Sequence, residues 1–507
     1  MAHAADRAPA GRAIAPVSRP AEAPSLRWVL FATLLGLALR GWALGANSLW
    51  VDEVATLQVA RHPFGAIPGV ALRGDAFEPP LYFWLVHLAI GVGGISEVAL
   101  RLLSAVAGAA LVPLTWRLVR ELDGSPLAAD LSATFVALNP LLLWYAQEAR
   151  PYALLSALGL ASLLSLALAL RRGGWRYWAG YAGLGGLALL THAVAVVFPA
   201  IGLSWVLLAE RPRRALVPFG LASSGMVLVI APLLVPLARA VLAADSTGSP
   251  PRALTGLEVP YTLFTFVAGY SFGPAVREIQ NSGWADAVRA HPVQTIVATG
   301  ALALWGLLVW RLRTQTALRL ALLLVVPVAA TFLGSVITTK AYNVRYTVPA
   351  VVGFAGLLGL GLARLPVPSR AGVTIALAAL SMWADVQWFT VPTYWKEDSR
   401  AAAACVQAAL PTGGVVAVAP GYMASALRHY VVKAGAPLRV EPVGGIADLD
   451  PRQPPSALLL TRLHHVADPA GLARAYEEMA APVGTATVPG YRLLLRDAPM
   501  SRCGAAR

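Results

Sequence analysis

The chain has 507 residues, of which 57% are hydrophobic and only 13% are charged. Soluble proteins carry about 25% charged residues, so the composition excludes a string of soluble domains and indicates an integral membrane protein. The net charge of +14 does not indicate nucleic-acid binding, because most arginines lie in short clusters between apolar segments and form no continuous basic surface.

Apolar segments of 17 to 22 residues recur along the first 390 positions, and these lengths suit helices that cross a lipid bilayer. Segment 79–95 differs from the others because it starts with two prolines and is interrupted by Gly91, Gly93 and Gly94. We predict that it lies along the membrane surface and that the other eleven segments cross the membrane. The twelve segments begin near residues 27, 80, 98, 127, 152, 176, 193, 216, 293, 320, 347 and 371.

The distribution of basic residues sets the orientation. With eleven spans, 17 basic residues lie in the inner loops and ten lie in the longer outer loops, in agreement with the excess of Lys and Arg found on the cytoplasmic side. A twelfth span at 79–95 would place every later arginine cluster outside. The sequence therefore predicts a polytopic α-helical membrane protein with about eleven transmembrane helices, a cytoplasmic N-terminus and an extracytoplasmic C-terminal α/β domain.

Residues 1–24 are rich in Ala and Pro and are predicted to form a disordered cytoplasmic tail, followed by the transmembrane domain over 25–390. The alternative is that the first apolar segment belongs to a signal peptide that is cleaved at Leu44-Gly45-Ala46. The first apolar segment is long for a signal peptide and contains Arg40, which favours an uncleaved span.

The first outer loop, residues 45–97, is predicted to hold membrane-parallel helices and carries the sequence Asn47-Ser48-Leu49-Trp50-Val51-Asp52-Glu53. Acidic groups at the edge of a membrane are costly and usually serve a function, so Asp52 and Glu53 are candidate catalytic residues. The structural alternative is that Asn47 and Ser48 cap a short helix whose first turn favours acids. The apolar residues around the pair favour catalysis.

Further polar residues follow in the chain. Glu78 precedes Pro79-Pro80 and an aromatic run that is typical of an interfacial helix. Arg101 starts the second span, where a snorkelling arginine and a functional one are equally expected. Glu148 and Arg150 are two positions apart and do not face each other on a helix, so we predict a separate partner for each.

The predicted topology places these residues, Tyr152 and the segment from Lys340 to Arg345 on one outer face. Independent polar segments that converge on one face of a bundle are typical of an active site. The outer segment 239–292 is predicted to cover this site as a mobile loop, and it is rich in aromatic residues: Tyr261, Phe264, Phe266, Tyr270 and Phe272.

Residues 391–507 are predicted to form the small α/β domain, with strands at 414–420, 438–441, 457–461 and 491–496 and helices at 421–433 and 469–480. No glycine-rich phosphate-binding motif follows a strand, so no cofactor is assigned. Cys405 and Cys503 have no metal-ligand spacing, and the sequence leaves open whether they form a disulfide.

Six segments, taken in order, resemble the polyprenyl-phosphate-sugar transferases, membrane glycosyltransferases of the GT-C class that include protein O-mannosyltransferases and the lipid A aminoarabinose transferase. Each motif is weak alone, whereas their order and spacing over the first 350 residues are specific. The chain departs from the aminoarabinose branch at Phe77-Glu78, where that branch has a lysine beside the acid. The segments are SLWVDE (48–53), EPPLYFW (78–84), RLLSAVAG (101–108), NPLLLWYAQEARPYAL (139–154), TH (191–192) and NVRYTVPA (343–350).

The resemblance implies inverting transfer of a sugar from a polyprenyl-phosphate donor to an acceptor hydroxyl at the outer face. It implies that Asp52 is the general base. Glu53 would position the acceptor or tune Asp52, since two close carboxylates raise at least one pKa. Glu148 would hold sugar hydroxyls, and Arg345, with Lys340 as second choice, would neutralise the leaving phosphate. No metal is required by this scheme, and the resemblance leaves a divalent metal ion open as an alternative. The remaining predicted substrate-binding residues are Glu78, Arg101, Arg150 and Tyr152.

The implied partners are the lipid bilayer, the polyprenyl-phosphate sugar and an acceptor glycan, lipid or protein. Only three of the 40 basic residues are lysines, and this bias predicts a bacterial protein of the inner (plasma) membrane. A polytopic transporter or flippase for lipids or lipid-linked sugars is the main alternative, but the spans show no duplicated halves and the acids gather at one face. Another alternative is a non-catalytic subunit that binds lipid-linked sugars, but the intact Asp52-Glu53 pair argues against this alternative.

Overall fold

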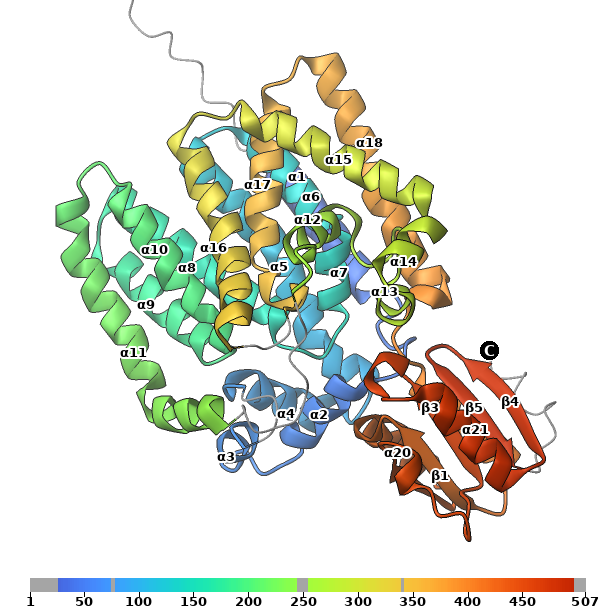
Figure 1. The fold of residues 1–507 in the computed structure, drawn as a ribbon. Coiled ribbons are helices and arrows are strands. Elements are labelled where there is room, and N and C mark those ends of the chain that lie inside the picture. The colour runs from blue at the N-terminus through green and yellow to red at the C-terminus, as the bar shows by residue number, and fades with distance from the viewer. Residues whose placement is uncertain (1–25, 74–77, 244–253, 339–341, 497–507) are drawn as a thin grey trace, which may run out of the picture.

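The computed structural model describes residues 26–73, 78–243, 254–338 and 342–496. The predicted disordered tail, Lys340 and Cys503 lie outside these residues. The described part consists of a helical bundle and a small α/β domain that lies beside one end of the bundle (Figure 1).

Helices occupy all eleven segments that the sequence predicts to cross the membrane. They are α1 (Leu26–Gly41), α5 (Glu97–Asp123), the pair α6 (Pro126–Ala137) and α7 (Pro140–Ala146), α8 (Tyr152–Arg172), α9 (Trp175–Leu189), α10 (Val197–Leu207), α11 (Pro212–Ala243), α15 (Pro292–Trp310), α16 (Gln315–Thr338), α17 (Ala350–Ala363) and α18 (Val367–Thr390). Within the described residues, six helices are long and apolar enough to cross a membrane, or seven if α6 and α7 form one span. The chain is thus a multi-pass membrane protein, and the count of eleven stays a prediction.

The break between α6 and α7 follows from the sequence Asn139-Pro140. The Asn139 side chain accepts a hydrogen bond from the Leu142 N–H at 3.0 Å, and Pro140 occupies the first helical position. Both features favour the start of a new helix, and α7 is bent by 54° from α6. Because α7 ends at Ala146, Glu148 and Arg150 lie in the turn before α8.

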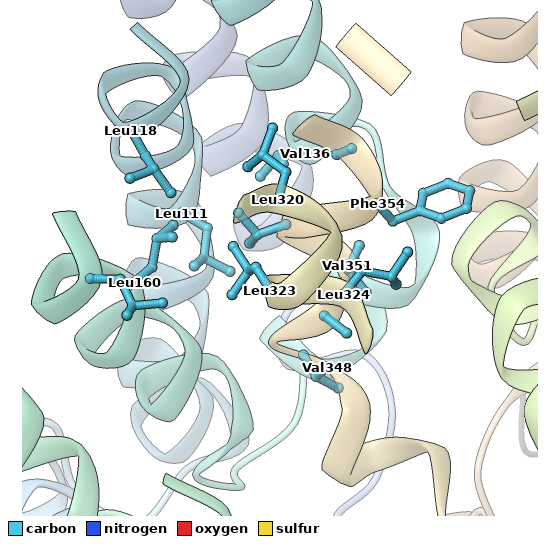
Figure 2. Close-up of a cluster of buried hydrophobic side chains, with 14 of the residues drawn as sticks. Leu111, Leu118, Val136, Leu160, Leu320, Leu323, Leu324, Val348, Val351 and Phe354 are labelled. Carbon is cyan, nitrogen blue, oxygen red and sulfur yellow. The ribbon is translucent and has the colours of Figure 1, made fainter. Parts of the chain in front are cut away.

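The core of the bundle is a layer of aliphatic side chains between α5, α6, α8, α16 and α17, including Leu111, Leu160 and Leu320 (Figure 2). Two glycines of α17 allow the backbones to approach closely. A Cβ atom at Gly353 would lie 2.6 Å from the Leu320 carbonyl oxygen, and one at Gly359 would lie 2.6 Å from the Ala128 carbonyl oxygen. Small residues of this kind are typical of helix contacts inside membranes.

Three short helices, α2 (Val51–Ala60), α3 (Ile67–Ala71) and α4 (Leu81–Gly93), lie across the end of the bundle (Figure 1). The 13 residues of α4 are fewer than the roughly 20 that a membrane-spanning helix needs. Since α10 and α17, which occupy predicted spans, are also short, the surface location of segment 79–95 stays a prediction.

The aromatic segment 239–292 forms α12 (Glu258–Ala268), α13 (Val276–Ser282) and α14 (Trp284–Ala290) in its described part. Phe266, Tyr270 and Phe272 are buried. These three rings are therefore part of the packed structure, whereas the sequence predicts a mobile loop.

The α/β domain is built on a five-stranded sheet in the order β2-β1-β3-β5-β4. β1 pairs in parallel with β2 and β3, and β5 pairs antiparallel with β3 and β4. Four predicted strands are present, whereas β4 and α19 are additional to the prediction. Cys405, in α19, is disulfide-bonded. The elements are α19 (Ser399–Ala409), β1 (Gly414–Ala419), α20 (Ala424–Lys433), β2 (Leu438–Pro442), β3 (Ala457–Thr461), α21 (Pro469–Ala480), β4 (Val483–Val488) and β5 (Tyr491–Arg496).

Candidate active site

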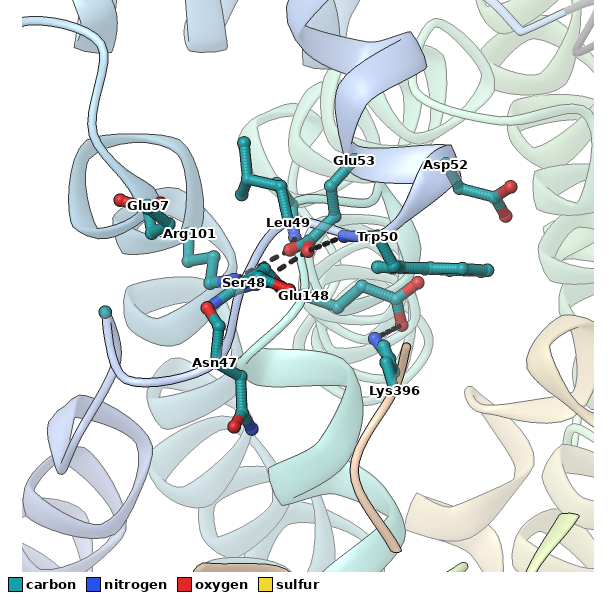
Figure 3. Close-up of polar contacts among 12 residues, drawn as sticks. Asn47, Ser48, Leu49, Trp50, Asp52, Glu53, Glu97, Arg101, Glu148 and Lys396 are labelled. Carbon is teal, nitrogen blue, oxygen red and sulfur yellow. Dashed lines mark hydrogen bonds and ion pairs between the residues drawn. The ribbon is translucent and has the colours of Figure 1, made fainter. Parts of the chain in front are cut away.

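The two adjacent acids at the start of α2 point in different directions (Figure 3). α2 begins after Trp50, which is its N-cap residue, and the Trp50 N–H donates a hydrogen bond to Glu53 Oε2 at 3.3 Å. Glu53 therefore caps its own helix, whereas the predicted caps Asn47 and Ser48 precede the N-cap residue. Asp52 instead lines an open cavity.

Glu53 is fully buried and connects three segments of the chain. Its two carboxylate oxygens accept hydrogen bonds from Nε and Nη2 of Arg101, each at 2.7 Å, and Oε1 also accepts from the Ala149 N–H at 2.7 Å. Arg101 donates in addition to three carbonyl oxygens in residues 44–48. The pair thus fixes the loop before α2 to α5 and to the turn before α8.

Asp52 forms an ion pair at the surface of the cavity. Its Oδ2 accepts a hydrogen bond from Arg345 Nη1 at 2.9 Å, and the two side chains keep 28% and 26% of their surface exposed. Arg345 lies in the short helix η3 (Val344–Thr347), where the Asn343 side chain accepts from the Arg345 N–H at 3.1 Å. Asp52 and Arg345 both line a cavity of about 380 Å³.

A second ion pair lines the same cavity. Lys396 Nζ lies 3.1 Å from Glu148 Oε2, as Figure 3 shows. The Lys396 ammonium also lies 4.8 Å from the ring centre of Trp50 and 5.2 Å from that of Trp144, within the range of cation–π attraction. Lys396 is thus held between one carboxylate and two aromatic rings.

A third ion pair comes from the α/β domain. Arg462, directly after β3, donates to Glu397 from Nε at 2.8 Å and from Nη2 at 3.3 Å. Its guanidinium carbon lies 5.2 Å from the ring centre of Trp50. Since Glu397 and Arg462 both line the cavity, the α/β domain forms part of its wall.

Behind the cavity wall, Arg150 donates to Glu78 from Nη2, and both side chains are buried. Tyr152 is also buried, and its ring lies 5.5 Å from that of His192 and 6.3 Å from that of Tyr346. Burial, together with the charges of Arg150 and Arg345, lowers the pKa of His192 to about 3, so this imidazole is neutral.

The electrostatics of Asp52 follow from its surroundings. Burial alone would raise the pKa of the Asp52 carboxyl, but nearby positive charges outweigh burial and hold this pKa below its ordinary value. The charges belong to Arg150, Arg345, Arg462 and Lys396.

Glu53 and Glu148 respond differently to burial. Burial would raise the pKa of Glu53, but the charge and hydrogen bonds of Arg101 outweigh burial and lower it. At Glu148, burial outweighs the opposing charge of Lys396, so the pKa is raised. The expectation that neighbouring carboxylates raise the pKa of Asp52 or Glu53 is therefore wrong, because each acid has its own arginine.

The structure brings Asp52, Glu148 and Arg345 together at the cavity. The predicted separate partners of Glu148 and Arg150 are confirmed: they are Lys396 and Glu78. Lys340 lies outside the described residues. The other predicted site residues do not line the cavity but support its wall from behind: Glu53, Glu78, Arg101, Arg150 and Tyr152.

Lys396, Glu397 and Arg462 are cavity residues that sequence reasoning missed. The only sequence signal for Lys396 is that it is one of three lysines in a chain with 40 basic residues. Arg462 has no signal in its own neighbourhood. In the structure its backbone has φ +40°, a conformation that non-glycine residues rarely adopt.

Fold and site together define a multi-pass membrane protein with a polar cavity, lined by three acid–cation pairs, at one end of its helical bundle. Residues 77–237 match the family model of dolichyl-phosphate-mannose-protein mannosyltransferases. No curated protein sequence matches the chain.

Three solved structures have a similar fold. ArnT from Cupriavidus metallidurans in the apo state is 15% identical, with a TM-score of 0.54 over 92% of this chain and 97% of that chain. The same enzyme bound to undecaprenyl phosphate is 14% identical, with a TM-score of 0.54 over 95% and 100%. The Archaeoglobus fulgidus oligosaccharyltransferase in the apo form is 12% identical, with a TM-score of 0.53 over 94% and 75%. The chain therefore has the fold of the GT-C membrane glycosyltransferases, as the sequence predicts.

Proposed function

We propose that the protein transfers a sugar from a polyprenyl-phosphate donor to an acceptor hydroxyl at the outer face of the membrane, with inversion at the anomeric carbon. The proposal is supported by relatives of the same fold: ArnT binds undecaprenyl phosphate, and the Archaeoglobus fulgidus enzyme AglB binds a dolichol-phosphate and an inhibitory peptide. The observation that carries it is the Asp52–Arg345 pair, exposed at the cavity beside Glu148 and Lys396.

In the proposed reaction Asp52 accepts the proton of the acceptor hydroxyl as that oxygen attacks the anomeric carbon. The bond from this carbon to the phosphate oxygen breaks, and its electron pair stays on the phosphate. Arg345 stabilises the added negative charge. One bond to the sugar forms and one breaks, which gives inversion without a covalent intermediate.

Arg345 can move between two anions in this scheme. Its Nη1 contacts Asp52, while its buried Nε has no hydrogen-bond partner in the structure. Buried donors usually have partners, and a phosphate oxygen would supply one. A phosphate on Arg345 would also weaken the hold of this cation on Asp52 and raise the pKa of the base when the donor is bound.

The other residues take supporting roles. Glu148 and Lys396 line the cavity and would bind the hydroxyls of the sugar. Glu53 and Arg101 would position Asp52 by fixing the loop before α2.

Arg345 performs the task that a metal ion has in other phosphate chemistry, so we propose a reaction without a metal cofactor. In the described residues, no group of three or more His, Cys, Asp or Glu side chains could hold a metal ion. A chelator is the direct test.

We further propose that the protein lies in a bacterial inner membrane with its N-terminus in the cytoplasm and the α/β domain outside. The disulfide at Cys405 supports an oxidising compartment for that domain. Reporter fusions after residues 122, 174 and 212 should show a cytoplasmic location, and fusions after residues 245 and 430 an outer one. The opposite pattern would mean that segment 79–95 crosses the membrane.

The central experiment uses purified protein in detergent with polyprenyl-phosphate mannose or glucose and measures release of polyprenyl phosphate in the presence of acceptor extracts. Asp52→Asn should abolish release in a folded protein. Asp286→Asn is the matched control, because Asp286 is an exposed acid of α14, 63% accessible. Full activity of Asp52→Asn would refute the assignment of the base.

A further inference from the structure

A second hollow, which the proposed reaction leaves unused, adjoins the catalytic cavity. It has a volume of about 170 Å³ and is lined by α12, α13, the start of α14 and residues 342–344. Five residues line both spaces: Tyr270, Val276, Gln280, Tyr342 and Asn343. The two spaces therefore adjoin each other along these five residues.

Aromatic rings form much of its surface. Trp284 packs edge-to-face on Tyr261, with ring centres 4.8 Å apart and an angle of 78° between the rings. Tyr342 is fixed by a 2.7 Å hydrogen bond between its hydroxyl and that of Thr262. Trp284 is only partly buried, so the hollow contains an aromatic ring that a ligand can cover.

The polar groups of the second hollow suit hydroxyl groups and not phosphates. Glu258 Oε1 accepts from the N–H and the hydroxyl of Thr255 at 2.8 and 3.0 Å, while its buried Oε2 has no partner in the structure. Gln280 and Asn343 add side-chain amides. The described lining residues include no Lys, Arg or His, in contrast to the catalytic cavity with Arg345 and Lys396.

These lining groups exclude an anion and a polyprenyl chain as ligands, whereas they fit a neutral sugar. An anion would meet Glu258 without a compensating cation, and a polyprenyl chain would bury the polar groups of Glu258, Gln280 and Asn343 without partners. A neutral sugar ring has apolar faces for the aromatic rings and hydroxyls for the carboxylate and the amides.

We propose that the second hollow is a subsite for a neutral glycosyl residue of a substrate that also occupies the catalytic cavity. The proposal rests on the glycosyltransferase function and sharpens it, because the substrate then has at least two sugars. The second sugar belongs either to an acceptor glycan or to an oligosaccharide donor.

The test is saturation-transfer-difference NMR on the purified full-length protein with maltose, lactose and α-1,2-mannobiose, each against the methyl glycoside of its monosaccharide. At least one disaccharide should bind about tenfold more tightly than its monosaccharide, equivalent to about 1.4 kcal/mol. Trp284→Ala should remove this gain and leave binding of the monosaccharide unchanged. Gln280→Ala, a smaller change, should reduce the gain.

Trp175→Ala is the matched control, because Trp175 is 82% exposed on α9 outside both hollows. The proposal is overturned if no disaccharide exceeds its monosaccharide, if Trp284→Ala weakens both equally, or if Trp175→Ala has the same effect.

Addition of the bound disaccharide to the donor-cleavage assay distinguishes the two sources of the sugar. Faster release of polyprenyl phosphate identifies an acceptor subsite, and inhibition identifies a donor subsite. If polyprenyl-phosphate sugars are not cleaved under any condition, the proposed function fails, while the binding comparison still decides whether the subsite exists.

Discussion

Replacement of Glu53 by Gln should destabilise the protein far more than replacement of its neighbour Asp52 by Asn. The Glu53 side chain is 0% exposed and that of Arg101 is 4% exposed. Removing one partner of a buried ion pair costs about 3–5 kcal/mol, because the other charge stays buried without compensation. The Asp52–Arg345 pair is about a quarter exposed, and exposed pairs contribute about 0–1 kcal/mol.

The assay is the apparent Tm of the purified variants in detergent at a fixed heating rate, since membrane proteins often unfold irreversibly. Glu53→Gln should lower the apparent Tm by several degrees, whereas Asp52→Asn should keep it and lose activity. In a double-mutant cycle, Glu53→Gln combined with Arg101→Gln should lower the Tm by less than the sum of the single changes.

A Glu53→Gln variant with the Tm of the unmodified protein and no activity would refute this reasoning. Glu53 would then contact substrate, as the sequence analysis predicts.

Three further predictions concern the proposed base Asp52, the packing of α17 and the requirement for a metal ion. Arg345→Gln should shift the acidic limb of the kcat/KM profile to higher pH. The proposed base Asp52 acts in its deprotonated form and Arg345 helps to hold its pKa low, so loss of that charge raises the pH at which activity falls. A shift to lower pH would contradict this role of Asp52. Gly359→Ala should lower the apparent Tm by an amount equivalent to about 1–3 kcal/mol, because the new Cβ would lie 2.6 Å from the Ala128 carbonyl oxygen, while Gly372→Ala, with no atom within 4 Å, should not. Dialysis against EDTA should leave the rate of donor cleavage unchanged, and restoration of lost activity by Mg²⁺ or Mn²⁺ would show that a metal takes part.

The helical part of the fold is predictable because apolar length and loop charge are local signals. Each of the eleven segments forms a helix, and the prolines and glycines of segment 79–95 mark the short helix α4. The missed strand β4 has no such signal. In Val483–Val488, Gly484, Thr485 and Thr487 interrupt the apolar residues, and the strand lies at the edge of the sheet, where only one neighbour specifies it.

A residue of the site is predictable only where it lies within a recognisable sequence motif. Asp52 and Arg345 lie in two separate motifs, and the predicted topology puts both on one face. Lys396 and Arg462 depend on partners 248 and 65 positions away, Glu148 and Glu397. Their placement is set by the docking of the linker and the α/β domain on the bundle, which no local pattern encodes.

In the proposed reaction Arg345 exchanges its contact with Asp52 for one with the leaving phosphate, whose charge differs from that of the donor. A donor phosphodiester carries one negative charge, whereas the released phosphate monoester carries about −1.5 to −2 near neutral pH. With this role Arg345 would attract the product more strongly than the donor, and the part of this gain that develops in the transition state would lower the barrier. The same attraction would slow product release. Added polyprenyl phosphate should thus inhibit with an inhibition constant below the KM of the donor. Arg345→Gln should bring the two constants together, and a product that binds more weakly than the donor would show that another group holds the leaving phosphate.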